Sequence, residues 1–370
     1  MKGSQFVSSL RERRAALGFS QTELANKVSV SRQALGYIET GRQIPSTQLA
    51  LELAASLRCS VDDLFQLASG SVVLSRLASP LEDTERLIVG QIGGVFVSHP
   101  LYDTTKAADG VFRGFAHKNN ADVASVELLA NQGSISANIL VAGCAPLLGV
   151  LCSRVERQYA DMRATWIPSD SSQSLGLLEQ NLVHVAGIHL ASSTDPHIHL
   201  DLARHTLPDQ TATIINLACW QQGLVVPRGN PMQITGVSDL LEPSIRCVQR
   251  NPGSGAQELL GRLLKEAGQG LEGCGSMPLA SSHAEVARMV STGVADTGVA
   301  IEAVAISEGL DFITLSDERF DLVLPESHLE LPAVARFVNL LDQPNFRSEA
   351  AKLPGYDLSL SGHLSTLRPH

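Results

Sequence analysis

The sequence lacks the features that would place a protein in or beyond a membrane. It contains no apolar run approaching the roughly 18 residues of a membrane-spanning helix. Its first residues, MKGSQFVSSLRERR, contain no apolar core of a signal peptide. It also lacks a Cys-x-x-Cys pair, so we expect reduced, mostly buried thiols rather than disulfides. The cysteines are Cys59, Cys144, Cys152, Cys219, Cys247 and Cys274. These absences predict a cytoplasmic protein with no membrane partner.

Positive charge is also scarce. The sequence contains 28 Lys and Arg residues and 38 Asp and Glu residues. The resulting net charge of -10 argues against uniform binding of nucleic acid. Residues 1–68 nevertheless contain eight basic and six acidic side chains, so the negative excess lies in the rest of the chain. Attraction to DNA is therefore expected at one end only.

The pattern of apolar residues divides the chain into four parts. At 370 residues it is long enough for two or three domains. Helical spacing predicts an all-α head over residues 1–68, followed by a linker over residues 69–85. Residues 86–133 predict a small β-rich section with turns between its strands. Residues 134–370 alternate strand and helix, which is typical of a parallel sheet covered by helices in an α/β domain. The predicted fold class is therefore multidomain.

Within the head, residues 19–46 predict two short helices, Gln21–Val28 and Ser31–Glu39, joined by a tight turn. Ser20 and Ser31 are good N-caps for them. Such a helix-turn-helix pair leaves the outer face of its second helix free to enter a DNA major groove.

The side chains on and around the second helix are candidates for DNA contacts. Arg32 and Gln33 are expected to reach base edges, because Arg suits guanine and Gln suits adenine. The others are expected to contact phosphates, which fix register without reading sequence. Gly36 should cost about 1 kcal/mol relative to Ala inside this helix. The candidate DNA-binding residues are Gln21, Lys27, Ser31, Arg32, Gln33, Tyr37 and Arg42.

Four short motifs carry a family resemblance in the head. They are Gln21-Thr22-x-Leu24-Ala25, Val30-Ser31-Arg32-Gln33, Ile38-Glu39-x-Gly41-Arg42 and Pro45-Ser46. With them, residues 5–67 resemble the Cro/repressor-type helix-turn-helix family, also called the XRE type. The resemblance implies binding of double-stranded DNA, and we expect a homo-oligomer, most simply a dimer. A helical bundle used for protein contacts is the alternative.

In the α/β domain, three segments follow predicted strands or open predicted helices: residues 142–145, 169–172 and 251–256. Ligands bind at such points in open parallel sheets. Free backbone N–H groups and small hydroxyls there form an anion site, which suits an oxyanion or a carboxylate metabolite. A tight turn is the simpler interpretation of Gly-Ser-Gly, and without a following Lys-Ser/Thr it is no nucleotide-binding loop. The candidate ligand-binding residues are Gly143, Cys144, Ser171, Ser172, His189, Trp220, Gly253, Ser254, Gly255 and His283.

The histidines allow more than one interpretation. His189 and His283 are either core residues or ligand contacts. His197 and His199 project to one side if they lie in a strand, but without a clear further ligand we expect surface loop residues there. Neither a metal site nor a cofactor is predicted.

A second family resemblance covers residues 134–365. It is carried by Gly143-Cys144-x-Pro146, the segments 184–190 and 223–231, Arg250-x-x-Gly253-Ser254-Gly255, His283-x-x-Val286-Ala287 and Ala295-Asp296-x-Gly298. This part resembles the periplasmic-binding-protein-like domain that is fused to repressor-type heads and is related to molybdate-binding proteins. The resemblance implies two α/β lobes joined by crossing strands, with a ligand between them.

These observations favour a ligand-responsive transcription regulator. An enzyme is not expected, because the sequence has no Gly-x-Ser-x-Gly elbow, no His-Glu-x-x-His motif and no recognisable pair of catalytic carboxylates. Two alternatives stay open. The α/β domain could serve oligomerisation or a protein partner without a small ligand, or the protein could be a carrier whose head binds protein.

Overall fold

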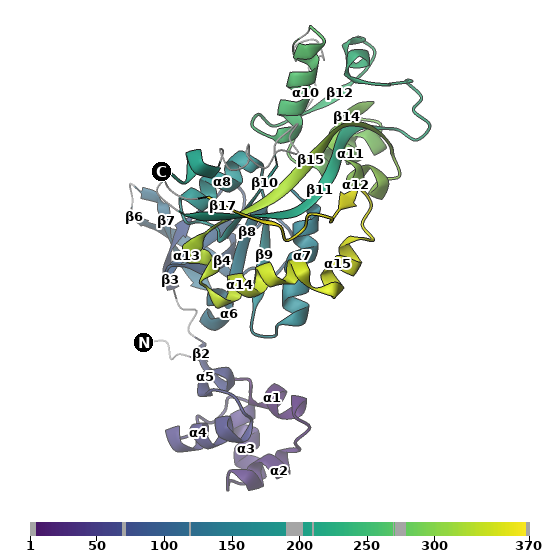
Figure 1. Ribbon diagram of the computed structural model, residues 1–370. Coiled ribbons are helices and arrows are strands. Elements are labelled where there is room, and N and C mark those ends of the chain that lie inside the picture. Colours follow the sequence, from purple (N-terminus) through teal and green to yellow (C-terminus); the bar gives the residue numbers. More distant parts are fainter. Residues whose placement is uncertain are drawn as a thin grey trace. The chain divides into compact units, whose positions relative to one another are not determined.

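The chain forms two compact units, residues 1–73 and 74–370 (Figure 1). The computed structural model describes residues 5–68, 72–117, 120–189, 203–208, 211–268, 270 and 279–367. His197, His199 and Cys274 lie outside these ranges. Across the described ranges, no helix combines the length and apolarity that crossing a bilayer would take.

The first unit is a bundle of five short helices beside a two-stranded antiparallel sheet. Its elements are β1 (Gln5–Ser8), α1 (Leu10–Ala16), α2 (Gln21–Lys27), α3 (Arg32–Glu39), α4 (Thr47–Ser56), α5 (Val61–Leu64) and β2 (Phe65–Ala68). β1 pairs with β2, so the head is helical in its core but not entirely α. Leu24, Leu35, Ile38 and Leu53 are fully buried between the helices.

Serine residues begin most of these helices. The Ser20 hydroxyl accepts a hydrogen bond from the Glu23 backbone N–H at 3.2 Å, and the Glu23 carboxylate accepts one from the Ser20 N–H at 2.7 Å. Ser31 caps α3 through the Ala34 N–H at 3.0 Å. The two helices expected over residues 21–28 and 31–39 are therefore present, each one residue shorter at one end.

The second unit begins with a small closed barrel of order β3-β5-β4-β6-β7. Its strands are β3 (Val72–Leu77), β4 (Arg86–Ile92), β5 (Val95–Pro100), β6 (Gly110–His117) and β7 (Asn120–Leu128). The expected linker over residues 69–85 contains β3, so the β-rich section begins before residue 86. In β3, the side chains of Ser75 and Leu77 are buried. β3 pairs in parallel with β5, and the local sequence pattern does not reveal this pairing.

An α/β domain follows the barrel, with a sheet of order β13-β12-β14-β11-β15-β10-β8-β9. The strands are β8 (Asn138–Gly143), β9 (Arg163–Pro168), β10 (Val185–His189), β11 (Ala212–Val226), β12 (Cys247–Arg250), β13 (Leu279–Ala280), β14 (Thr297–Ile301), β15 (Asp311–Pro325), β16 (Tyr356–Asp357) and β17 (Leu364–Leu367). The helices are α6 (Gln132–Ser136), α7 (Pro146–Gln158), α8 (Ser171–Glu179), α10 (Gly255–Glu266), α11 (His283–Ser291), α12 (Glu302–Ser307), α13 (Glu326–Leu329), α14 (Pro332–Asn339) and α15 (Pro344–Ala350), with 3-10 turns η1 (Val237–Leu241) and η3 (Leu340–Asp342).

Two long antiparallel strands, β11 and β15, divide this domain into two lobes (Figure 1). The first lobe contains β8, β9, β10, α7 and α8, and β10 pairs with the Phe320–Val323 stretch of β15. The second lobe contains β12, β13, β14, α10 and α11, and β14 pairs with the Gln222–Val225 stretch of β11. Residues in the middle of the long strands, such as Trp220 opposite Glu318, therefore lie at the junction of the lobes.

The barrel packs against the first lobe through a shared apolar core. Ile88 and Val97 of the barrel belong to the same buried cluster as Leu140 of β8. The Asn138 side chain donates to the Val89 carbonyl at 3.0 Å, and the His99 Nε2 atom lies 2.8 Å from the Leu182 carbonyl. The second lobe has a core of its own between η1, α10 and the ends of β11 and β14.

Candidate functional site

The exposed face of α3 presents the predicted DNA-contacting side chains. Arg32, Gln33 and Tyr37 are exposed, while Leu35 and Ile38 on the opposite face are buried. The Gln33 amide donates to the Tyr37 hydroxyl at 3.0 Å, so the two side chains support each other on the helix surface. This arrangement leaves a polar, partly basic helix face available for a DNA groove.

A chain of polar contacts joins this face to a buried ion pair. Arg14 Nε lies 2.5 Å from Glu39 Oε1, and both side chains are largely buried. Gln21 Nε2 donates to Glu39 Oε2 at 2.7 Å, and Arg32 Nε donates to Gln21 Oε1 at 3.4 Å. Both polar atoms of the Gln21 amide are therefore hydrogen-bonded, the nitrogen to Glu39 and the oxygen to Arg32. The Gln21 side chain thus helps to position Arg32.

A shallow hollow on the surface of the head brings five of the seven predicted DNA-binding residues together. Lys27 and Ser31 lie outside it: Lys27 Nζ lies 5.2 Å from the centre of the Phe19 ring, and the Ser31 hydroxyl caps α3. Gly36 adds no side chain to this surface. The lining residues are Gln21, Arg32, Gln33, Gly36, Tyr37, Thr40 and Arg42.

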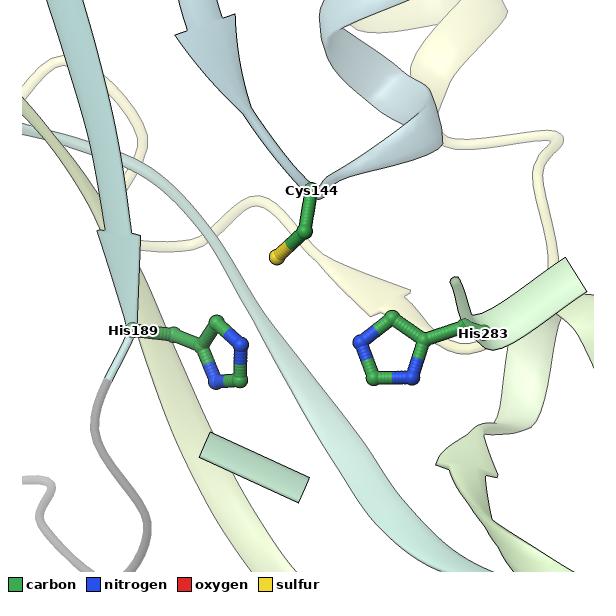
Figure 2. Close-up of side chains that lie close together, drawn as sticks. All are labelled: Cys144, His189 and His283. Atoms are coloured by element: carbon green, nitrogen blue, oxygen red, sulfur yellow. The ribbon is translucent and has the colours of Figure 1, made fainter. Parts of the chain in front are cut away.

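In the α/β domain, several predicted ligand-binding residues converge on His189, the last residue of β10. The His189 backbone exchanges hydrogen bonds with the Ser171 hydroxyl, 3.0 Å from its N–H and 2.9 Å from its carbonyl. Gly255 of α10 packs so closely on the His189 ring that a Cβ there would overlap it. Cys144, His189 and His283 each present a ligand atom, and these three atoms lie within 4.8 Å of one another (Figure 2).

The residues around His189 lie at the beginnings of helices. Cys144 precedes α7, Ser171 begins α8, Gly255 begins α10 and His283 begins α11. Helix N-termini carry unpaired N–H groups and a partial positive charge. Helix N-termini of both lobes therefore meet near His189, and their partial positive charges favour an anion there.

Several polar groups here are buried without a hydrogen-bond partner among the described residues. They include both ring nitrogens of His283, the Nη1 atom of Arg250 and the Oε1 atom of Glu318. Arg250 uses its other nitrogens, donating from Nε to the Ala280 carbonyl at 3.0 Å. Such groups are costly to bury unpaired, so their concentration at the lobe junction marks a place where a ligand would supply the missing contacts.

The electrostatics of the two histidines differ. Burial disfavours charge on His189, but the nearby Cys144 sulfur and Glu318 carboxylate outweigh it and raise the pKa of the imidazole to about 10. Burial, reinforced by the positive charges of Arg250 and His189, lowers the pKa of His283 well below its ordinary value. One imidazole is thus cationic and the other neutral near pH 7.

The remaining predicted residues have mainly structural contacts. Trp220 is buried, with its ring centre 5.3 Å from that of His189, and its Nε1 atom donates to Glu318 at 3.3 Å. The Ser254 hydroxyl caps α10 through the Gln257 N–H at 3.3 Å. Gly253 faces Ser172 across the lobes. The Gly143 carbonyl accepts a hydrogen bond from the Trp166 indole at 2.8 Å.

Sequence reasoning left out two residues of this neighbourhood, Glu318 and Arg250. Arg250 precedes the Gly-Ser-Gly motif and ends β12, a position that a strand-end search could have found. Glu318 gives no such signal, because it lies in the middle of β15 and reaches His189 only through the sheet register.

A separate pocket of about 650 Å³ lies between the barrel and the first lobe. It is lined by apolar and polar residues of both, among them His99, Tyr102, Trp166 and Gln173. None of the predicted ligand-binding residues contributes to its lining. The lobe junction and this pocket are therefore distinct places in the same unit.

Comparisons with known proteins match both units. A family model described as a helix-turn-helix matches residues 10–64, and one described as a PBP superfamily domain matches residues 152–342, just over half of the chain. The chain is 27% identical over 228 residues to the uncharacterised protein YvgK of Bacillus subtilis, covering 61% of this chain and 72% of that protein. It is 44% identical over 59 residues to an uncharacterised HTH-type transcriptional regulator of Methanothermobacter thermautotrophicus, covering 16% of this chain and 86% of the relative.

Solved structures align with about 60% of the chain. A phosphate-bound ABC transporter substrate-binding protein from Clostridium perfringens aligns with a TM-score of 0.47 at 11% identity, over 60% of this chain and 99% of that one. An ABC-type phosphate transport receptor from Vibrio cholerae aligns with a TM-score of 0.40 at 13% identity, over 60% and 99% of the two chains.

Proposed function

Because the chain belongs to the PBP superfamily and begins with a helix-turn-helix domain, we propose that it is a ligand-responsive transcription regulator. The head binds operator DNA through α3. The α/β domain binds a small anionic molecule, an oxyanion or a carboxylate, between its two lobes. This binding changes the affinity for DNA.

The observation that carries the sensing half of this proposal is the convergence of four helix N-termini on His189. Backbone N–H groups and the helix dipoles favour an anion there without a lysine or a nucleotide-binding loop. The unpaired Nη1 atom of Arg250 adds positive charge. An oxyanion or a carboxylate would satisfy the donors that burial leaves without partners.

The DNA-binding half is supported by the exposed face of α3. Arg32 and Gln33 occupy the first turn, where recognition helices of this class contact base edges. Arg42 and Lys27 are exposed basic residues nearby, suited to phosphates. Tyr37 and Ser31 complete the polar surface.

Coupling between the two halves requires that the effector bind two states of the protein with different affinity. In a dimer, repressor-type heads contact half-sites about 34 Å apart, one helical turn of DNA. An effector that draws the two lobes together alters the geometry of the dimer, and a small rotation then weakens the fit of the second head.

The test combines DNA binding and thermal stability on the full chain. An operator is first selected from random DNA. Its affinity is then measured with and without molybdate, phosphate, sulfate and small carboxylates, alongside the melting temperature. We expect one of these anions to raise the melting temperature, because it binds the folded state alone. The same anion should change DNA affinity by at least about fivefold, the lower range of allosteric coupling.

A matched pair of variants localises the effect. Arg250→Gln removes a buried guanidinium at the lobe junction, and Arg262→Gln removes a partly exposed one from α10. We expect the first to abolish the thermal response and the second to retain it. If no anion changes either stability or DNA affinity, the sensing proposal is wrong, and a role of the α/β domain in oligomerisation or partner binding takes its place.

A further inference from the structure

Cys144, His189 and His283 come from three distant parts of the chain and turn toward one another at the lobe junction. Figure 2 shows the Cys144 sulfur between the two imidazoles, with a nitrogen of each ring facing into the shared space. We propose that these three residues bind one transition metal ion of the zinc class. This is a site that the sequence did not predict.

The donor set selects the class of metal. Thiolate and imidazole together suit Zn²⁺ and related soft or borderline ions, and not Mg²⁺ or Ca²⁺, which prefer oxygen. Zn–N bonds of about 2.0–2.1 Å and Zn–S bonds of about 2.3 Å place tetrahedral ligand atoms about 3.5 Å apart. The three ligand atoms lie within 4.8 Å of one another, so small side-chain rotations bring them to a single ion.

A carboxylate orients one of the two imidazoles. His189 Nδ1 lies 2.8 Å from Glu318 Oε2, and both side chains are almost completely buried. This contact occupies Nδ1 and leaves Nε2 as the metal ligand. A carboxylate on the far nitrogen of a metal-binding histidine fixes its tautomer and strengthens its basicity. The Trp220 indole N–H donates to the same carboxylate oxygen and holds it in place.

His283 provides the independent support. It is 2% exposed, and neither of its ring nitrogens has a hydrogen-bond partner in the described part of the chain. A buried imidazole without partners is costly. Coordination of one nitrogen to a metal ion removes much of that cost.

The charges around the three residues match a divalent ion. With two neutral imidazoles, the Cys144 thiolate and the Glu318 carboxylate bring two negative charges, which a divalent ion balances. Arg250 lies at the same junction, and its Nη1 atom is buried without a partner among the described residues. The ion and Arg250 together therefore leave one positive charge for an anion.

The ion joins the two lobes. Cys144 and His189 belong to the first lobe, and His283 belongs to the second. Three protein ligands leave the fourth tetrahedral position open. This part of the inference rests on the proposed function: the fourth ligand is the anionic effector, held between the metal and Arg250.

The experiment measures metal binding directly, without DNA or an effector. The full chain is made without a histidine tag, stripped with a chelator and titrated with Zn²⁺ and with Co²⁺. We expect one ion per chain, a tetrahedral Co²⁺ spectrum and a thiolate-to-cobalt charge-transfer band. Cys144→Ser should remove the charge-transfer band, and His283→Gln should weaken binding strongly. Glu318→Gln should weaken it about 10–100-fold, as for other groups that orient metal-binding histidines.

Matched controls are Cys219→Ser and His363→Gln, a cysteine and a histidine outside the cluster, and both should bind like the unaltered protein. The proposal is overturned if the unaltered chain gives no charge-transfer band or binds less than one ion. It is also overturned if Cys144→Ser and His283→Gln bind as tightly as the controls, or if binding is lost instead on changing His197 and His199. A positive metal titration with no anion effect on DNA would refute the sensing function and leave the metal site standing.

Discussion

His189 and Glu318 form a buried pair across the junction of the two lobes, with Nδ1 of the histidine 2.8 Å from Oε2 of the glutamate. The two residues are 129 positions apart in the chain. β10 pairs with β15 through His189 and Phe320, which sets this contact. The proposed metal site depends on how this pair orients the imidazole.

Removal of the Glu318 carboxylate should destabilise the α/β unit. Glu318→Ala leaves a buried imidazole and the Trp220 indole without their acceptor, so we expect a loss of about 3–5 kcal/mol in the free energy of unfolding. Glu318→Gln retains an acceptor and should lose less. Both tryptophans, Trp166 and Trp220, lie in this unit, so urea unfolding of the metal-free protein followed by fluorescence reports the change.

Asp317→Ala serves as the control for this series, because Asp317 neighbours Glu318 but is exposed. It should change the unfolding free energy by no more than about 0.5 kcal/mol. Equal effects of Glu318→Ala and Asp317→Ala on the free energy of unfolding would show that the buried His189–Glu318 pair does not stabilise the unit.

A methyl group at position 255 should disturb the same contact from the other lobe. Gly255→Ala places a Cβ against the His189 ring, and overpacking of this kind costs about 1–3 kcal/mol. Gly176→Ala in α8 meets no atom within 4 Å and should stabilise the unit by up to about 1 kcal/mol. Urea unfolding of the two variants should therefore shift in opposite directions, and a shift in the same direction would contradict the close packing of α10 on His189.

Gly36→Ala should stabilise the head. An added Cβ there meets only the Gln21 amide, at 3.9 Å, so the gain of about 1 kcal/mol in helix propensity is not offset by a clash. Hydrogen exchange measured by mass spectrometry on the full chain should show up to about fivefold slower exchange in peptides from α3. Faster exchange would mean that the backbone of α3 needs glycine at this position.

Residues of the head should separate into base readers and phosphate contacts. Arg32→Ala and Gln33→Ala should each lose about 1–3 kcal/mol of operator affinity and relax specificity at one base pair. Lys27→Ala and Arg42→Ala should weaken binding to all sequences and reduce the salt dependence by about one unit of slope each. Competition assays over a range of salt concentrations distinguish the two classes. If all four variants lose affinity equally for every DNA sequence, the assignment of Arg32 and Gln33 to base contacts is wrong.

Acid should destabilise the second unit because several of its histidines, His99 and His184 among them, are buried in the neutral form. Burial lowers the pKa of His99 to about 4 and also that of His184 to about 4. The unfolded chain therefore binds more protons between pH 6.5 and 4, and stability that is complete above pH 6.5 falls as the pH drops through this range. Each histidine should contribute a loss of about 3 kcal/mol.

His99→Gln tests this pH dependence. A glutamine amide can still donate to the Leu182 carbonyl, but it does not titrate. We expect the loss of stability between pH 6.5 and 4, measured by urea unfolding, to be smaller in the variant by about 3 kcal/mol, because His184 and the other buried histidines still titrate. An unchanged pH profile would show that His99 is not responsible.

Much of the head could be predicted because its signals are local. The hydroxyls of Ser20 and Ser31 accept hydrogen bonds from backbone N–H groups three residues ahead, and Leu35 and Ile38 repeat at helical spacing, so a short stretch of sequence contains the information. The barrel is different. The sequence predicts a linker where β3 lies. Its pairing partner β5 is about twenty residues away, and because the two strands are parallel, no hairpin turn between them indicates the pairing.

The lobe junction shows the same division. Local signals indicate where strands end and helices begin, so the positions of Cys144, Ser171 and His283 at strand or helix ends could be predicted. That these residues surround His189, and that Glu318 and Arg250 join them, follows from the packing of the two lobes. The physical reason is that strand ends are set by neighbouring residues, whereas the partners of a buried side chain are set by sheet order and register between strands more than a hundred residues apart.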